Sequence, residues 1–144
     1  ISHATLGSAT GATFDGRRNG KSLSDGCCPV QGRDTHGPTA LIRSLTGWDQ
    51  TAFLGGMVIN LKFSKSLFTP LKKQTLIDII GAFIHRGGIE MQINCVDKKT
   101  LEDACIHPEA HRDLIVRIGG YSDYFVNLNN ELQDNIIERT FMNI

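Results

Sequence analysis

The sequence predicts an α/β fold, because stretches with the two-residue period of strands alternate with stretches of helical period. Three strands are expected over residues 57–63, 89–96 and 114–118, and a helical pattern follows each of them. If the strands are parallel, the connections between them should be right-handed. At 144 residues the chain fits one domain and is long enough to bury a core.

Caps and periodicity place the first elements. A helix is expected over residues 38–45, since it begins with a proline, which suits the first helical turn. Residues 57–63 alternate apolar and polar side chains and predict a strand with one apolar face. Thr69 and Pro70 predict the start of a second helix, as its cap and first-turn residue. This helix should end at the glycine pair 87–88 and bury one apolar stripe, formed by Leu76, Ile79, Ile80, Phe83 and Ile84.

The second strand, residues 89–96, carries apolar side chains on one face and polar ones on the other: Ile89, Met91, Ile93 and Cys95 against Glu90, Gln92 and Asn94. A helix should then begin at Thr100, which forms a capping-box pattern with Asp103. Pro108 should break that helix near His107. The last element is expected to be an amphipathic helix with one apolar side, formed by Leu128, Leu132, Ile136 and Ile137.

Residues 1–37 differ in composition from the rest of the chain. They hold seven of the fifteen glycines and few periodic apolar positions, which predicts an extended arm without a core of its own. We therefore divide the chain into an arm, 1–37, and a domain, 38–144. Residues 11–16 imitate a phosphate-binding loop, but Arg17 and Arg18 follow where Lys and Ser or Thr are needed, so nucleotide binding is not expected.

Charge and composition exclude several classes of protein. Fifteen basic residues balance fifteen acidic ones, so nothing favours nucleic acid or an anionic membrane as a partner. No apolar run approaches the ~20 residues that a membrane span needs, and no signal-peptide pattern is present. Four cysteines are too few and too irregular for a secreted disulfide framework, which favours reduced thiols in the cytoplasm. The chain begins with Ile1, which indicates a processed chain, an expressed portion, or a piece of something longer.

The third strand runs directly into Gly119 and Gly120, and aromatic residues follow at Tyr121, Tyr124 and Phe125. Glycine is chosen where φ is unusual or where something approaches the backbone closely. A glycine pair after a strand is most often a tight turn. Here, a backbone carbon without a side chain lies at a strand end among bulky groups that could enclose it.

Residues 117–121, Arg-Ile-Gly-Gly-Tyr, resemble the C-terminal signature of the glycyl radical enzymes: an arginine, an aliphatic residue, a small residue, the radical-bearing glycine and an aromatic. On this match Gly120 is the radical position, and Arg117, Gly119 and Tyr121 support its loop. Other segments resemble the family in the same order, and they extend over nearly the whole chain: Asp15-Gly16-Arg17, Asp25-Gly26, Pro29-Val30-Gln31-Gly32-Arg33-Asp34, Gly37-Pro38-Thr39-Ala40, Gly87-Gly88 with Gln92-Ile93-Asn94, and Leu132-Gln133 to Arg139-Thr140.

The resemblance implies both a fold and an activity. It implies the C-terminal part of a ten-stranded α/β barrel of the pyruvate formate-lyase type, with the radical glycine on a loop after the last strand. A separate radical S-adenosylmethionine activase with an iron–sulfur cluster would make the radical. Gly120 would then draw a hydrogen from a catalytic cysteine on another segment or chain, and the resulting thiyl would attack a small-molecule substrate. The loop would have to swing out to reach the activase.

The branch of the family is only partly indicated. Residues 31–34 and 37–40 look more like the dehydratase, decarboxylase and lyase branches, whereas Arg139-Thr140-Phe141 leans toward pyruvate formate-lyase. Asp123 stands where relatives usually carry a small apolar residue. The substrate is left open, because its contacts and the thiyl cysteine would lie on the part of the enzyme that these motifs do not cover.

The cysteines and a group of histidines could in principle be catalytic or bind a metal, but the sequence favours a structural role for them. Cys27 and Cys28 lie outside the family's cysteine loop, so they are expected to be buried small apolar residues, and Cys95 to belong to the core. Cys105, His107 and His111 cluster within seven residues, but Pro108 disturbs their helical spacing, and no metal site is predicted.

Three functions remain open from the sequence. The chain could be a subunit or part of a glycyl radical lyase or dehydratase that is inactive without a large chain carrying the cysteine. It could be a repair module that restores an enzyme cleaved by oxygen at the radical glycine. It could also be a non-catalytic docking domain that keeps the glycine pair only as a turn. The glycine-rich arm favours the first of these.

Overall fold

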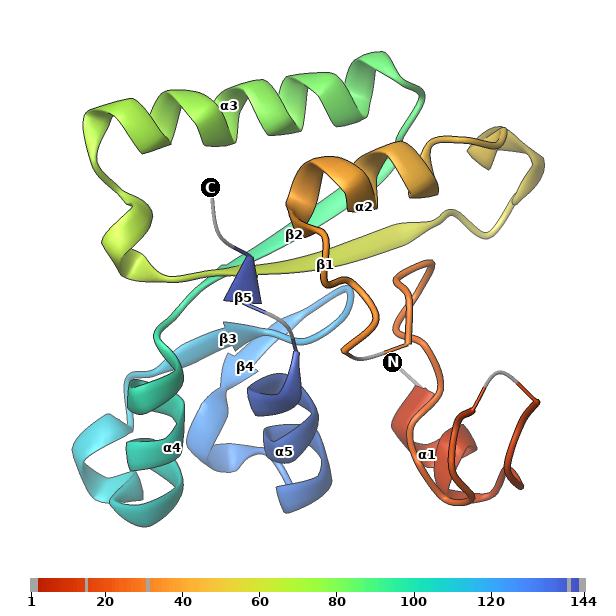
Figure 1. Cartoon of the computed structure of the whole chain (residues 1–144). Helices are drawn as coiled ribbons and strands as arrows, with labels where there is room; N and C mark the ends of the chain where they lie inside the picture. Colours follow the sequence, from red (N-terminus) through yellow and green to blue (C-terminus); the bar gives the residue numbers. More distant parts are fainter. Residues whose placement is uncertain (1–2, 15, 31, 140, 143–144) are drawn as a thin grey trace.

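The computed structural model describes residues 3–14, 16–30, 32–139 and 141–142 (Figure 1). Asp15, Gln31 and Thr140, which belong to motifs named above, lie outside the described residues. No helix in the described part of the chain is both long and apolar enough to cross a bilayer.

The α/β prediction is confirmed by a three-stranded sheet with the order β2–β1–β5. Strands β1 (Val58–Phe63) and β2 (Glu90–Cys95) are parallel and are connected by helix α3 (Pro70–His85). Strand β5 (Phe141–Met142) pairs with the other edge of β1, also in parallel. The sequence did not predict β5, because two residues are too short to show a period.

Helices α2 (Gly37–Leu45) and α3 cover one face of this sheet (Figure 1). Their apolar side chains join those of β1 in the first core, which includes Leu41, Ile42, Ile59, Leu61, Phe63, Ile79 and Phe83. Both helices begin and end near their predicted limits, with Thr69 accepting a hydrogen bond from the Lys72 amide at the start of α3. The predicted stripe of α3 is wrong at Ile84, which is 64% exposed because this helix meets the core mainly through Ile79 and Phe83.

The other side of the sheet faces a second unit, which consists of a hairpin and two helices (Figure 1). Strands β3 (Ile115–Arg117) and β4 (Ser122–Tyr124) form an antiparallel hairpin, and α4 (Lys98–Ile106) and α5 (Asn130–Glu138) pack around it. A second apolar core fills this unit, formed by Val96, Leu101, Ala104, Val116, Ile118, Phe125 and Ile136.

Two sequence predictions about this unit are wrong. Within this chain the glycine loop does not follow the last strand, because β4, which pairs with β3 in a sheet of its own, and β5 come after it. Helix α4 begins at Lys98 instead of Thr100, and Asp97 occupies its N-cap position. The Asp97 carboxylate accepts hydrogen bonds from the Ser64 hydroxyl and the Lys65 amide, while Asp103 contacts two histidines instead of capping the helix.

The arm consists of a short helix, α1 (His3–Ser8), and loops that lie against the rest of the chain. Arg17 is buried and donates hydrogen bonds to carbonyl oxygens of the surrounding loop, including those of Gly11 and Lys21, so it holds that loop in place. The Cys27 amide donates to the Val58 carbonyl of β1. Four short 3₁₀ helices complete the described elements: Gln50–Ala52, Lys65–Leu67, Pro108–His111 and Phe125–Asn127.

Candidate functional site: a glycine hairpin held by buried polar side chains

Gly120 lies in the turn that joins β3 to β4. Arg117 and Ser122 form the last strand pair, and the Ile118 amide donates a hydrogen bond to the Tyr121 carbonyl across the turn at 3.0 Å. Gly120 has φ +85°, in the left-handed region where other residues are strained. Gly119 is buried, whereas Gly120 and Tyr121 are exposed in this chain. The α-carbon at the tip of the hairpin is therefore accessible from outside.

The sheet presents polar side chains to this hairpin. Asn60 and Lys62 of β1 lie beside Gln92 and Asn94 of β2 in the parallel register. Lys62, Gln92 and Asn94 are only 1%, 5% and 6% exposed, so the polar face of β2 is its better buried face. Alternation in the sequence identified the two faces of β2 correctly but could not show which of them another unit covers.

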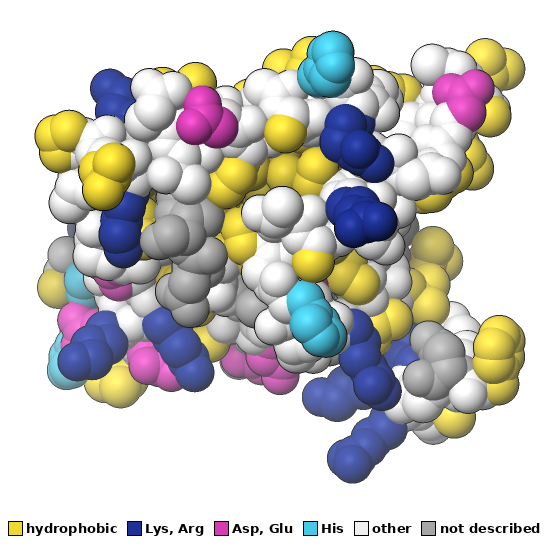
Figure 2. Space-filling view, turned by 45° about the horizontal axis from the view of Figure 1, so that its top comes forward, with side chains coloured by type: hydrophobic (Ala, Val, Ile, Leu, Met, Phe, Trp, Pro, Cys, Tyr) yellow, Lys and Arg dark blue, Asp and Glu magenta, His cyan; other side chains and the backbone are white. Residues whose placement is uncertain are grey.

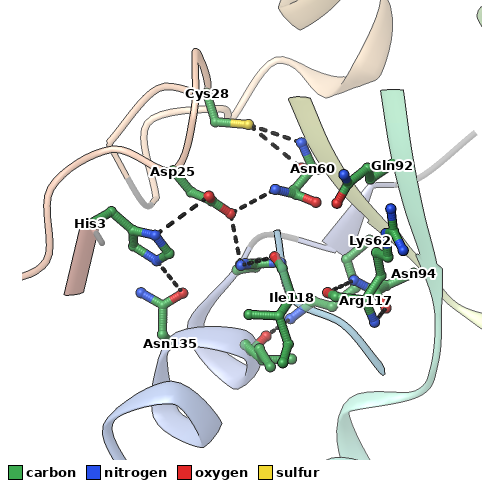
Figure 3. A network of polar contacts seen from close by, with 12 residues as sticks. His3, Asp25, Cys28, Asn60, Lys62, Gln92, Asn94, Arg117, Ile118 and Asn135 are labelled. Carbon is green, nitrogen blue, oxygen red and sulfur yellow. Dashed lines mark hydrogen bonds and ion pairs between the residues drawn. The ribbon is translucent and has the colours of Figure 1, made fainter. Parts of the chain in front are cut away.

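Two amide side chains of β2 bind the backbone of the hairpin, and Figure 3 shows the contact of Asn94 with Arg117. Asn94 Nδ2 donates to the Arg117 carbonyl and Asn94 Oδ1 accepts from the Arg117 amide, each at 2.7 Å. Gln92 Oε1 accepts from the Gly120 amide at 3.2 Å, and Gln92 Nε2 donates to Glu90 at 2.5 Å. These contacts fix the base and the tip of the glycine turn relative to the sheet.

Arg139 connects the hairpin to the arm. Its Nη2 donates to the Ile118 carbonyl at 3.0 Å and lies 2.7 Å from Asp25 Oδ2. Asp25 also accepts a hydrogen bond from Asn60 Nδ2 at 2.8 Å and lies 3.5 Å from His3 Nδ1 (Figure 3). Burial lowers the pKa of the Arg139 guanidinium, and the neighbouring Asp25 carboxylate opposes that change. The residue before the glycine pair is thus tied to the arm through an almost fully buried ion pair.

Lys62 lies behind the hairpin and stabilises the end of α5. Its Nζ donates to the carbonyls of Ile136 and Ile137 at 2.8 and 3.0 Å, and lies 3.9 Å from the centre of the Phe141 ring. Cations are favoured at carbonyls that end a helix. Burial, and secondarily the positive charge of Arg139, lower the pKa of Lys62 to about 7.

The predicted loop residues lie close together because they are consecutive in the hairpin. Arg117 is anchored by its backbone, and its Nη1 reaches the Ser122 hydroxyl at 3.5 Å. Tyr121 contributes its carbonyl to the turn and leaves its ring partly exposed. Asp123 Oδ1 accepts a hydrogen bond from the Tyr124 amide at 2.7 Å.

The cysteines of the chain do not form a reactive group with the glycine turn. Cys27 and Cys28 contact the carbonyls of Val58 and Asn60, and burial raises their pKa, to about 12 for Cys28. Thiols in that range are rarely ionised and therefore poor nucleophiles, which supports their structural interpretation. Burial also raises the pKa of Cys95, which is partly buried in β2.

The histidine cluster has partners other than a metal. Asp103 accepts from His107 Nδ1 at 3.0 Å and from His111 Nε2 at 2.7 Å, contacts that lower the pKa of its carboxyl group. Within the described ranges no group of three His, Cys, Asp or Glu side chains is arranged to hold a metal ion.

Gln92, Asn94 and Arg139 were missed as functional candidates by sequence reasoning. All three fall within the segments that resemble the glycyl radical enzymes, so those segments could have drawn attention to them. Their contacts with Arg117, Ile118 and Gly120 join distant parts of the chain and leave no local pattern.

Comparison with known proteins identifies this arrangement. A family model described as "Glycine radical" matches residues 23–126. The chain is 39% identical to the trans-4-hydroxy-L-proline dehydratase of Clostridioides difficile over 139 residues. This alignment covers 96% of this chain and 18% of that enzyme. The chain is 38% identical to the 4-hydroxyphenylacetate decarboxylase glycyl radical subunit of Clostridioides difficile (strain 630), over 96% of this chain and 15% of the subunit.

A solved structure agrees with these sequence matches. The B12-independent glycerol dehydratase from Clostridium butyricum superposes with a TM-score of 0.95 at 38% identity, over 99% of this chain and 18% of that enzyme. The fold and the glycine hairpin therefore define a glycine radical domain. The chain belongs to the glycyl radical enzyme family, and its relatives named here are dehydratases and a decarboxylase, as the sequence motifs indicated. It spans 15–18% of the length of these relatives.

Proposed function

We propose that Gly120 stores an unpaired electron for a glycyl radical lyase or dehydratase, in which this chain is the C-terminal, radical-bearing part or subunit. The observation that carries the proposal is the position of Gly120 at an exposed hairpin tip whose backbone is held from behind by buried side chains. Removal of a hydrogen atom from the α-carbon leaves a radical that the flanking amides stabilise. A side chain would hinder both planarity and approach, which explains the need for glycine.

The proposed reaction moves one hydrogen atom at a time. A radical S-adenosylmethionine activase would abstract a hydrogen atom from the Gly120 α-carbon. A cysteine on a large chain would then give its hydrogen atom to that carbon, so that an S–H bond breaks, a C–H bond forms and the unpaired electron moves to sulfur. The thiyl would abstract hydrogen from a small substrate. Arg117, Gly119 and Tyr121 would hold the loop during these steps.

Shelter for the radical has to come from outside this chain, since Gly120 is exposed here. Apolar side chains of the same hairpin are exposed too, among them Ile115, Tyr121 and Tyr124. Figure 2 shows apolar side chains among charged ones over the face that it displays. Exposed apolar patches commonly mark surfaces that another protein covers. In the proposal the cover is a ten-stranded barrel to which this chain contributes strands, and the glycine loop would swing out of it to meet the activase.

The arm fits this proposal as a connection to the larger body. We propose that residues 1–37 end the barrel portion and residues 38–144 form the glycine radical domain, with Asp25 and Arg139 holding the two together. The whole enzyme would be oxygen-sensitive and cytoplasmic.

The test is anaerobic electron paramagnetic resonance after treatment with an activase. We expect a doublet from the radical in the wild-type chain and its loss in Gly120→Ala. Gly87→Ala is a matched control, because Gly87 has φ +87° and an added Cβ would meet no atom within 4 Å. Both variants introduce alanine at nearly the same strained φ, so only the radical position should matter. A doublet that persists in Gly120→Ala would refute the proposal.

The same preparation separates the other two functions. If the chain restores activity to a glycyl radical enzyme already cleaved by oxygen, it acts as a repair module. If no doublet forms with an activase and a large chain both present, the glycine pair serves only as a turn, and the docking interpretation holds.

A further inference from the structure

The two apolar cores of the chain are separated by a polar layer. Asn60 and Lys62 of β1 and Gln92 and Asn94 of β2 lie on the face of the sheet away from the first core, and three of these polar side chains, Lys62, Gln92 and Asn94, are buried there (Figure 3). A parallel sheet covered on both faces is ordinarily apolar on both. Burying an amide costs free energy unless all its groups are hydrogen-bonded. Gln92 and Asn94 meet that condition mainly through the backbone of the hairpin.

Asn94 takes the place of a neighbouring strand. The side-chain amide of Asn94 forms two hydrogen bonds with the backbone of one residue, Arg117: it donates to the carbonyl and accepts from the N–H. Two residues of an antiparallel ladder form the same kind of pair through their backbones. The Arg117 amide and carbonyl are thereby satisfied without joining the parallel sheet. Strand β3 lies against the sheet through side chains, and among the described strands its backbone pairs with β4 alone.

Gln92 reaches the turn itself. Its Oε1 accepts from the Gly120 amide, the nitrogen bonded to the proposed radical carbon, while its Nε2 is fixed by Glu90. An acceptor on that N–H sets the plane of the peptide group before Gly120. It also increases the electron density on the nitrogen, which donates into the radical centre.

We propose that Gln92 and Asn94 are positioning residues, which hold the glycine turn on the sheet and tune the Gly120 radical through its amide. The tuning rests on the proposed function of Gly120, but the holding does not. Because these contacts come from side chains, the turn can leave the sheet and return without breaking a strand ladder. Asn94 sets the base of the hairpin and Gln92 sets the orientation of the Gly120 peptide.

The holding is tested on the unactivated chain by amide hydrogen exchange. In Gln92→Leu the Gly120 amide should exchange about 5-fold to 10-fold faster, which corresponds to about 1–1.4 kcal/mol, the net contribution of one hydrogen bond. Asn94→Leu removes both the acceptor for the Arg117 amide and the donor to its carbonyl, so a similar acceleration is expected at the Arg117 amide. Amides of α3 serve as the internal reference for global stability.

Two matched variants separate positioning from general damage. The exchanged pair Glu90→Gln with Gln92→Glu keeps an acceptor for Gly120 and should restore slow exchange. Gln133→Leu removes another partly buried amide, which donates to the Phe125 carbonyl at 2.9 Å, and should leave the Gly120 amide unchanged. Equal exchange at Gly120 in the wild type and Gln92→Leu would overturn the proposal.

The tuning is read from the activated chain by electron paramagnetic resonance with ¹⁵N at Gly120. Gln92→Leu should change the nitrogen hyperfine coupling of the doublet, and the exchanged pair, which restores an acceptor for the Gly120 amide, should move the coupling back toward the wild-type value. An unchanged coupling in Gln92→Leu would overturn the tuning. If the wild type gives no doublet while the exchange differences at Gly120 persist, the proposed radical function fails and the holding by Gln92 and Asn94 stands.

Discussion

Lys62 provides a direct test of the polar layer behind the hairpin, because its pKa of about 7 lies well below the ordinary value of 10.5. Between these two values the unfolded chain binds more protons than the folded chain, so the stability of the fold rises with pH. Two-state linkage with these pKa values gives an increase of about 1.5 kcal/mol between pH 7 and pH 8.5. The increase comes from releasing a proton from an ammonium group that is almost completely buried.

The measurement is urea unfolding at several pH values between 7 and 8.5 for the wild type and Lys62→Met. Methionine keeps the length and apolar body of the side chain but does not titrate. The cysteine thiols act in the opposite direction above about pH 9, because their raised folded pKa means that the unfolded chain ionises first. The difference between the two proteins at each pH cancels this contribution. Parallel stability curves for wild type and Lys62→Met would refute the lowered pKa of Lys62.

Two further predictions concern glycines that contact other parts of the chain. An added Cβ at Gly26 would lie 2.3 Å from the Val58 carbonyl, so Gly26→Ala should destabilise the fold by about 2–4 kcal/mol and expose the arm to limited proteolysis. Gly32→Ala is the control: Gly32 has φ +78° and open space around it, so this variant should show only the backbone strain of about 1–2 kcal/mol. If the protease cleaves the arm equally slowly in both variants, the contact between Gly26 and Val58 is wrong. At Gly88 an added Cβ would lie 2.3 Å from the Phe83 ring, so Gly88→Ala should lower the urea midpoint through overpacking of about 1–3 kcal/mol. Gly87→Ala should show only the strain of its positive φ, and a Gly88→Ala midpoint equal to that of the wild type would show that the Phe83 ring does not contact this site.

Local chemistry was sufficient to predict helices α2 to α5 and strands β1 and β2, but neither the short helix α1 in the arm nor the parallel direction of the two strands. Proline in the first turn and glycine after the last turn set the limits of α3 to within a residue or two, because those residues act on the backbone where they stand. The same reasoning misplaced the start of α4. There the competing cap, Asp97, is followed at once by the helix, while Thr100 lies inside it.

Elements that depend on distant partners could not be predicted in the same way. Strands β4 and β5 have three and two residues, too few for a period, and they exist because β3 and β1 offer free edges. The pattern of β2 showed two faces, and a polar face is ordinarily solvated. Here the hairpin covers it, so Gln92 and Asn94 are buried by a unit that follows them in the chain.

The arrangement around Gly120 distinguishes a positioned loop from an ordinary surface turn. A glycine needed only for its positive φ would leave the neighbouring backbone groups to water, at no cost in buried polar atoms. Here the amide of Gly120 and the carbonyl of Ile118 are bound instead by Gln92 and Arg139, which are almost completely buried. Ordering and desolvating these two long polar side chains costs free energy that a solvated turn avoids. That cost is explained if the place of the exposed α-carbon matters, as it does when a second protein has to reach one hydrogen atom on it.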